Sequence, residues 1–540
     1  MHFRAAAAFV LAGVASTSVD MYNPPNINYN TEHGIVRHIL DPATQNTPLR
    51  FTQQHLRPPP PRLPSVFDIF IGISSYRDGV RCGFTLFTAF SRATHPDRVY
   101  VGVVDQVLPT DATCLDEYCK LATSHWGECK FKSHITIDSH DAAASQGPTI
   151  ARHTQQQLIR DEEFCLQLDA HSQLLADWDT KLVKEWVRTD NEMAVLTAYP
   201  SGFHMIDENG TYPHLSASHL CDHSKRSGPD DIPFATGILF IEYSERPQLS
   251  AFFGAGLSFS KCHAEKRVRV DNYTKWLFFG EESLRSYALW SHGYDLYSPS
   301  RHGSVVFHNW TNDPSRTSYV YHLYLFFIKL ILRLCKSNFM LVYIRYMQHP
   351  LPEAARRRRA DEEKASGNRV RAVLTLPFHG DVDTTGLSWF YNGSVRSVES
   401  FLGFHGVSNA NASWDQERCH QLHWVPYERP EIVEQLLPGW VQEGLGAHER
   451  SNDMQNLVAD TLQALRDQWT KDKEHMLHNV ELMHLKGLED RTHLPASVAE
   501  VLPAMAVGVA LASVALVTRW RRRCTSSTSS SSAAKSSDYA

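Results

Sequence analysis

The chain has 540 residues, of which 42% are hydrophobic and 21% are charged, and its formal net charge is -6. This composition excludes an intrinsically disordered chain, and the acidic balance gives no reason to expect nucleic acid as a partner, because nucleic-acid-binding domains carry a basic face. The ten cysteines form no Cys-x-x-Cys pair and no four-ligand zinc spacing. They indicate buried thiols, or one or two disulfides, rather than a zinc knuckle.

The N-terminal residues 1–20 have the features of a cleavable secretory signal or a weak signal anchor. A basic start is followed by an apolar stretch and small residues at Gly13 and Ala15, the pattern of a signal peptide, and the apolar stretch is too short to span a bilayer. Residues 21–64 are polar and rich in proline, and they end in RPPPPRLP. Polyproline stiffness favours a stem between an anchor and a domain.

Apolar, β-rich runs alternate with segments of helical spacing through residues 65–316. We expect strands at 67–75, 98–106, 133–141, 162–172 and 193–199, and helices at 80–93, from about 148, and at 177–188. Such alternation predicts an α/β domain with a mostly parallel sheet and helices on both faces. In sheets of this kind, ligands bind at the carboxyl ends of the strands.

The composition changes abruptly in residues 317–372. No acidic residue occurs between Asp313 and Glu353, and the segment is strongly apolar with lysine and arginine at helical spacing. Three alternatives remain open, a membrane-surface helix, a second membrane crossing or translated intron, and the abruptness favours the last. The charged run at 355–369 indicates a linker.

The C-terminal part is expected to hold a closing segment of the domain at 373–440 and a helical stalk at 441–497. Residues 501–518 carry no charge and are followed at once by four arginines within RWRRR. This predicts a transmembrane helix over 498–520, a cytoplasmic basic and serine-rich tail at 521–540, and a lumenal location for everything before the helix. The alternative is an alanine-rich soluble helix.

Asp169 and His171 stand two residues apart at the end of the strand FCLQLD. Side chains two apart on an extended strand point to the same side. A carboxylate oxygen and an imidazole nitrogen suit manganese or magnesium together with phosphate oxygens, and they also suit zinc. The pair is therefore a candidate metal site.

Other polar groups also follow predicted strands or begin predicted helices. FIGISSYRDG places Ser74 and Arg77 where a nucleotide can meet the sheet edge, although an Arg–Asp surface turn is the alternative. GPTIAR places Arg152 on the first turns of a helix, where a diphosphate gains both a cation and the helix N-terminus. WLFFGEES offers the paired carboxylates Glu281 and Glu282.

Seven blocks in order, SSYRD, GPTIAR, LQLDAHS, GAGLSFS, LFFGEES, SHGYDLYSP and VFHNW, resemble one family. It is the family of polypeptide N-acetylglucosaminyltransferases that act on hydroxyproline of a cytosolic ubiquitin-ligase adaptor, with relatives that glycosylate mucin-like proteins in the Golgi of trypanosomatids. The resemblance covers roughly residues 65 to 312. GSVRSVESFLGFHGV, from Gly393, is similar to the closing segment of the family.

The resemblance implies a nucleotide-sugar-binding α/β domain of the GT-A type. It implies a retaining, metal-dependent transfer of GlcNAc from UDP-GlcNAc to a hydroxyl of an acceptor polypeptide, on hydroxyproline, Ser or Thr, with Mn or Mg as cofactor. The implied residues are the metal ligands Asp169, His171 and His308; the nucleotide contacts Ser74, Arg77 and Arg152; the sugar or acceptor contacts Gly254, Gly256 and Phe259; and the catalytic carboxylates Glu281 and Glu282.

The two ends of the chain do not fit an enzyme that modifies a cytosolic adaptor. A signal and a C-terminal helix suit an enzyme with its catalytic domain in the lumen of the ER or Golgi, and cytoplasmic location is the alternative. Asn-x-Ser/Thr sequences permit lumenal exposure; they begin at Asn209, Asn272, Asn309, Asn392 and Asn411.

The alternative function is a catalytically silent sugar-nucleotide or glycan-binding protein. A zinc hydrolase would need a closed set of nitrogen ligands, which the sequence does not offer.

Overall fold

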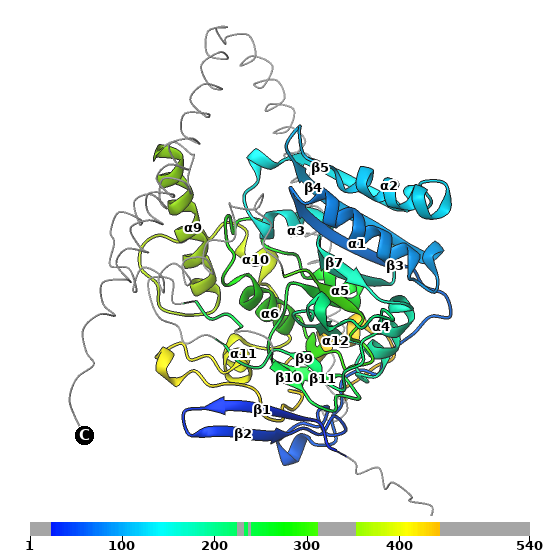
Figure 1. Cartoon of the computed structure of the whole chain (residues 1–540). Helices are drawn as coiled ribbons and strands as arrows, with labels where there is room; N and C mark the ends of the chain where they lie inside the picture. The colour runs from blue at the N-terminus through cyan, green and yellow to red at the C-terminus, as the bar shows by residue number, and fades with distance from the viewer. Residues whose placement is uncertain (1–22, 224–231, 236–238, 311–352, 443–540) are drawn as a thin grey trace, which may run out of the picture. The chain divides into compact units, whose positions relative to one another are not determined.

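The structure, a computed structural model, describes residues 23–223, 232–235, 239–310 and 353–442 (Figure 1). The predicted signal at 1–20, the apolar part of the insert, most of the predicted stalk at 441–497 and the predicted transmembrane helix at 498–520 lie outside these residues. Within them, no helix has both the length and the apolar character that a membrane crossing needs.

A mixed eight-stranded sheet, in the order β11-β13-β8-β12-β6-β3-β4-β5, carries the described domain. Its strands are β3 (Ile69–Tyr76), β4 (Val99–Val107), β5 (Ile135–Asp141), β6 (Phe164–Asp169), β8 (Ala194–Thr197), β11 (Gln248–Ser250), β12 (Leu257–Lys261) and β13 (Asp295–Ser298). β3, β4, β5 and β6 pair in parallel, whereas β12 is antiparallel to β6 and β8, and β11 is antiparallel to β13. The predicted mostly parallel sheet is confirmed.

Helices cover both faces of the sheet, as predicted. They are α1 (Gly79–Ser91), α2 (Cys114–Trp126) and α4 (Trp178–Val187) on one face, and α3 (Pro148–Gln156), α5 (Cys262–Arg267) and α6 (Glu281–Ser291) on the other. Alternation along the strands supports both layers, since Leu196 of β8 packs into the first core and Val195 into the second. Gly72 of β3 permits close approach of α3, because a Cβ there would lie 2.1 Å from Nε2 of Gln155.

Helix α2 has clear end signals, although it was not among the predicted elements. The Thr113 side chain accepts a hydrogen bond from the Asp116 backbone N–H, and Gly127 ends the helix in the left-handed conformation at φ 82°. These are the N-cap and C-terminal glycine that stabilise helix ends.

Residues 23–64 do not form the predicted stiff stem. They contain the antiparallel hairpin of β1 (Asn26–Thr31) and β2 (Gly34–Ile39). Ile27 and Leu40 are buried in a small core with Cys221 and Cys419, and Leu56 is buried against the α6 side of the domain. The prediction is wrong because a few apolar residues, spread among prolines and polar groups, find distant partners that local composition does not reveal.

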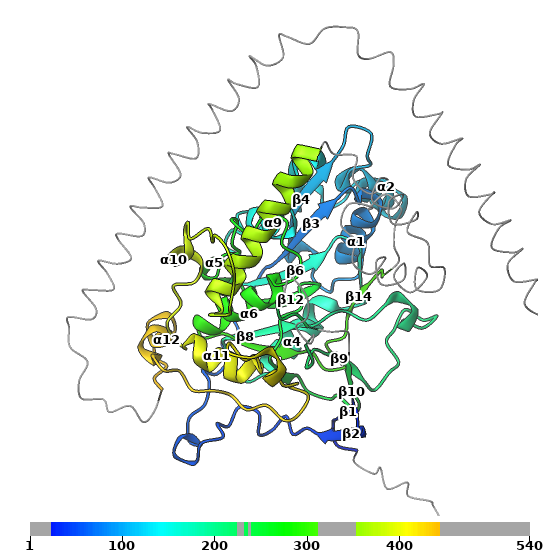
Figure 2. The same ribbon diagram turned by 90° about the vertical axis from the view of Figure 1, so that its left-hand side faces the viewer.

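The charged run predicted as a linker is the long helix α9 (Glu353–Val373). Its last turns are buried, with Val370 in a core shared with Leu284 of α6 and with Phe401. Figure 2 shows α9 running beside α6. The closing segment adds the helices α10 (Leu387–Phe390), α11 (Val398–His405) and α12 (Pro430–Leu436).

Three smaller sets of elements complete the described part. The strands β9 (Ala217–His219) and β10 (Leu239–Ile241) pair with each other, as do β7 (Ser172–Leu174) and β14 (Val306–His308). Short 3-10 helices are found at Phe51–Gln53, Pro96–Arg98, Lys132–His134, Ala142–Ala144, Phe203–Met205 and Ala412–Trp414.

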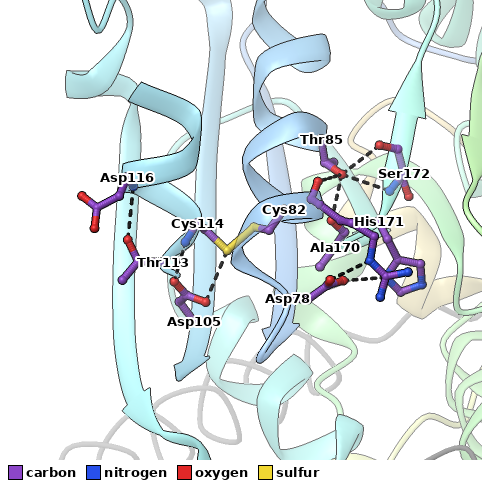
Figure 3. The surroundings of a disulfide bond; sticks show 11 residues. Asp78, Cys82, Thr85, Asp105, Thr113, Cys114, Asp116, Ala170, His171 and Ser172 are labelled. Carbon is purple, nitrogen blue, oxygen red and sulfur yellow. Dashed lines mark hydrogen bonds and ion pairs between the residues drawn. A yellow bond between two sulfur atoms is a disulfide. The ribbon is translucent and has the colours of Figure 1, made fainter. Parts of the chain in front are cut away.

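Four disulfides crosslink the described residues, which is more than the one or two expected. They are Cys82–Cys114, Cys119–Cys129, Cys165–Cys262 and Cys221–Cys419. The first joins α1 to the start of α2 (Figure 3). The sequence hid these bonds because pairing depends on strands and helices that meet only in the fold.

Candidate active site

The candidate site lies at the carboxyl ends of β3 and β6. Ser74 of β3 is the register partner of Asp169, the last residue of β6. His171 follows in the turn that leads from β6 to β7. The parallel pairing of β3 and β6 therefore sets the predicted nucleotide-facing strand beside the predicted metal pair.

His308 lies 137 positions after His171 in the sequence. A small antiparallel sheet brings it to the same place. In the pairing of β14 with β7, His308 is opposite Ser172. The Asn309 backbone N–H donates to the His171 carbonyl at 2.9 Å, and the His308 backbone N–H donates to the Ser201 carbonyl at 2.9 Å. Backbone bonds on both sides thus hold His308 next to the β6–β7 turn.

Asp169, His171 and His308 converge as a group. Each offers one ligand atom, and these atoms all lie within 4.8 Å of one another. Nε2 of His308 is 3.0 Å from Oδ2 of Asp169, and the two imidazole rings meet edge to face with centroids 4.3 Å apart. One carboxylate oxygen and two imidazole nitrogens can bind a divalent cation.

The electrostatics keep these groups in the protonation states that a metal ligand needs. Burial by itself raises the pKa of Asp169, but the hydrogen bond from His308 and the charges around it lower that pKa below its ordinary value. Burial lowers the pKa of His171 to about 4, and it also lowers the pKa of His308 despite the neighbouring Asp169. Near neutral pH the set is a carboxylate with two neutral imidazoles, as metal binding requires.

Arg152 of α3 links this group to the N-terminus of α6. Its guanidinium lies 3.3 Å from Oδ1 of Asp169 and is hydrogen-bonded to Oε1 of Glu281. Burial raises the pKa of Glu281, and Arg152 opposes that rise. The predicted phosphate-binding arginine and one predicted catalytic carboxylate are therefore neighbours of the metal-ligand candidates.

Glu282 has both carboxylate oxygens engaged by the protein. Oε1 accepts a hydrogen bond from the Ala255 backbone N–H at 2.9 Å, and Oε2 accepts one from the Tyr199 hydroxyl. Burial raises the pKa of Glu282 to about 7. Glu282 thus anchors the Ala255 backbone and the Tyr199 hydroxyl, and burial favours the protonated form of its carboxyl.

Gly254 permits close approach to the Ala198 backbone, and Gly256 permits close approach to the Pro200 ring. A Cβ on Gly254 would lie 2.7 Å from the Ala198 carbonyl carbon, and one on Gly256 would lie 3.0 Å from Cδ of Pro200 and 3.6 Å from Oδ2 of Asp169. A larger residue at either position would force the loop at 254–256 or the chain at 198–200 to shift. The structure places both glycines at the edge of the site.

Phe259 does not lie where a sugar or acceptor can touch it, which corrects that prediction. Phe259 belongs to strand β12, in the middle of the sheet, and is fully buried. Its ring stacks on Phe164 with centroids 5.2 Å apart. Alternation along β12 turns this residue into the core.

Ser74 and Arg77 are held by protein groups. The Ser74 hydroxyl donates to Oε1 of Gln155 at 2.8 Å. Arg77, in the left-handed region at φ 52°, makes two hydrogen bonds to Asp111 at 2.7 and 3.1 Å. Their role as nucleotide contacts remains a prediction.

Three further residues beside the site were given no role from the sequence. Asp78 is buried against His171, Tyr199 donates to Glu282, and Trp310 lies over His308 with ring centroids 3.9 Å apart. Trp310 is 51% exposed, and its indole N–H donates to the Pro200 carbonyl. Asp78 and Tyr199 end or follow predicted strands, so their position at the ligand-binding edge was a usable signal.

Comparison with known proteins gives a family. The sequence model described as Glycosyltransferase (GlcNAc) matches residues 68–125 and 119–411, which is more than half of the chain. No curated protein sequence matches the chain.

Two solved structures show a distant likeness. A structure of GalNAc-T7 with UDP, GalNAc and Mn²⁺ is 15% identical, with a TM-score of 0.36, over 63% of this chain and 57% of that one. A mannosyltransferase from Pyrobaculum calidifontis with GDP-Man and Mn²⁺ is 15% identical, with a TM-score of 0.26, over 45% of this chain and 57% of that one. The aligned part therefore spans 57% of the length of each, and a likeness of this extent carries no weight for substrate or metal. By the match over most of the described domain, the chain belongs to the Glycosyltransferase (GlcNAc) family.

Proposed function

We propose that the protein is a metal-dependent glycosyltransferase of the GT-A type, which moves GlcNAc from UDP-GlcNAc to a hydroxyl of a polypeptide with retention of configuration. The acceptor residue is hydroxyproline, Ser or Thr. The observation that carries the proposal is the convergence of Asp169, His171 and His308 at the carboxyl edge of the sheet, in a chain of this family.

The three residues fit a divalent cation, Mn²⁺ or Mg²⁺. The candidate ligand atoms all lie within 4.8 Å of one another, so Asp169, His171 and His308 could hold one cation together. The mixed oxygen and nitrogen set suits Mn²⁺ better than Mg²⁺. A cation held here would supply positive charge to the diphosphate leaving group.

The surrounding residues balance and position charge. Arg152 is a fixed guanidinium beside Asp169, and Glu281 orients it from the other side. A buried arginine held in this way can bind phosphate oxygens without reorganisation during the reaction. Glu282 and Tyr199 hold the loop that contains Gly254 and Gly256 against the site.

Ser74 and Arg77 complete the proposed nucleotide side. Ser74 is the register partner of Asp169, which supports a contact near the nucleotide. Arg77 now pairs with Asp111. To contact a nucleotide, as the resemblance implies, its guanidinium would either leave Asp111 or bind Asp111 and the nucleotide together.

We also propose that the domain works in the lumen of the ER or Golgi, held to the membrane by the helix predicted at 498–520. The four disulfides support an oxidising compartment. The Asn-x-Ser/Thr sites at Asn209 and Asn411 are exposed, as glycan attachment in the lumen requires.

A donor screen tests the proposed function. The full chain is incubated with Mn²⁺, with UDP-GlcNAc, UDP-galactose or UDP-glucose, and with peptides that contain hydroxyproline, Ser or Thr. We expect a peptide mass increase of one GlcNAc with UDP-GlcNAc, and an α-linked product by NMR, since UDP-GlcNAc is α-linked and the transfer retains configuration.

Transfer from another donor in preference would contradict the proposed sugar, and a β-linked product would contradict retention. Donor binding without UDP release or glycopeptide, across all the acceptors, would favour the silent binding protein instead.

A further inference from the structure

We propose that Asp78 is a positioning residue of the metal site, which accepts a hydrogen bond from Nδ1 of His171 and thereby leaves Nε2 as the nitrogen that binds the cation. Thr85 supports it by fixing the backbone on both sides of His171. This inference rests on the proposed metal-dependent function and adds residues of α1 to its site.

The position of Asp78 in the fold indicates this role. It is the N-cap residue of α1, where an aspartate usually accepts hydrogen bonds from its own helix, yet its side chain makes no capping bond. Instead Oδ2 lies 3.2 Å from Nδ1 of His171, and Oδ1 lies 2.6 Å from Nε of Arg81. The residue is 4% exposed.

The hydrogen bond selects one form of the His171 imidazole. A carboxylate paired with a guanidinium only accepts hydrogen bonds, so the nitrogen that faces it carries the proton. In neutral imidazole the other nitrogen, Nε2, then has the free lone pair. Carboxylates act in this way behind many metal-binding histidines.

Thr85 lies two turns further along the same face of α1 and holds the turn that bears His171. Its hydroxyl oxygen is 2.8 Å from the carbonyls of Ala170 and Ser172, and it accepts a hydrogen bond from the Ser172 N–H at 3.0 Å. Figure 3 shows Thr85 reaching from α1 to the backbone of Ala170 and Ser172, and Asp78 reaching to the His171 ring. One helix therefore orients both the ring and the backbone of His171.

Mn²⁺ binding to the full chain tests the inference without relying on catalysis. Free Mn²⁺ is measured by electron paramagnetic resonance during titration, with and without UDP, for the wild type, Asp78→Ala, Asp78→Asn, Thr85→Val and Thr85→Ser. We expect Asp78→Ala to weaken Mn²⁺ affinity by about 10- to 100-fold. Asp78→Asn keeps an acceptor oxygen and should weaken it less.

The threonine pair separates positioning from general stability. Thr85→Val has nearly the same shape without the hydroxyl and should weaken Mn²⁺ binding several-fold, whereas Thr85→Ser keeps the hydroxyl and should restore it. Asp179→Asn is the matched control, since Asp179 is a buried carboxylate that accepts from the backbone of Thr94 and His95. It should lower the melting temperature and leave Mn²⁺ affinity unchanged.

Two results are distinguishable failures. A wild type that binds Mn²⁺ while Asp78→Asn and Thr85→Val bind it equally well would overturn this inference alone. A wild type that binds no Mn²⁺, with or without UDP, would overturn the proposed metal dependence and this inference with it. If Asp78→Ala fails to fold, Asp78→Asn and the Thr85 pair still decide between these results.

Discussion

Glu282 shows how one residue near the site links protonation to folding. Its carboxyl is buried between the Ala255 backbone N–H and the Tyr199 hydroxyl, and burial raises its pKa from 4.5 to about 7. At pH values between 4.5 and about 7, the folded chain therefore keeps a proton that the unfolded chain has lost. The resulting stability is fully present below the unfolded pKa and is lost as pH rises through the folded pKa.

Glu282→Gln should remove this pH dependence, because glutamine has no proton to lose. Melting temperatures of both proteins are measured from about pH 5 to about pH 8. We expect the melting temperature of the wild type to fall relative to that of the variant as pH rises. Glu208→Gln removes an exposed carboxyl and serves as the control. A constant difference between the wild type and Glu282→Gln would show that the Glu282 carboxyl does not titrate in this range.

The sequence alone predicted the chemical candidates of the site but not their partners. Asp169 and His171 stand out because two polar groups end an apolar strand, and the resemblance adds His308. Asp78 and Tyr199 gained their roles only from the fold, since each contacts a residue more than 80 positions away. Phe259 was misassigned because its strand lies in the middle of the sheet.

At the scale of elements, the strands and helices with strong local patterns were predictable. β3, β4 and β6 are continuous apolar runs, and α1 and α4 lie within a few residues of their predicted bounds. The β1–β2 hairpin and α9 were not predictable, because their polar compositions hide a few apolar residues that only distant partners bury. For such segments, tertiary contacts outweigh local pattern.

The hairpin should contribute to folding, unlike a stem. Ile27 is 1% exposed and packs in a core with Cys221 and Cys419, so Ile27→Ala should lower the free energy of unfolding by about 2–4 kcal/mol. Ile35, in the same hairpin, is 71% exposed, and Ile35→Ala should change it by less than about 0.5 kcal/mol. Urea unfolding of the two variants measures both free energies. Equal free energies of unfolding for Ile27→Ala and Ile35→Ala would instead support the prediction that residues 23–64 are a stem.

At the scale of the whole described molecule, distant segments are brought to one edge of a sheet. The pairing of β14 with β7 delivers His308 to the turn after β6, and α3 and α6 deliver Arg152 and Glu281 to Asp169. The disulfides Cys165–Cys262 and Cys221–Cys419 close loops of 97 and 198 residues that include β7, α6 and β14. Long crosslinks restrict the unfolded chain most, so they stabilise the fold on which the site depends.

The most direct test measures UDP formation from UDP-GlcNAc by the full chain and by His308→Ala, each with Mn²⁺ and with excess chelator. The account predicts that the wild type turns over with Mn²⁺ and stops in chelator. His308→Ala should lose at least about 100-fold in rate, since a ligand of the charge-stabilising site is gone, while its melting curve stays close to that of the wild type. Equal rates for both proteins, or wild-type turnover that is unaffected by the chelator, would contradict it.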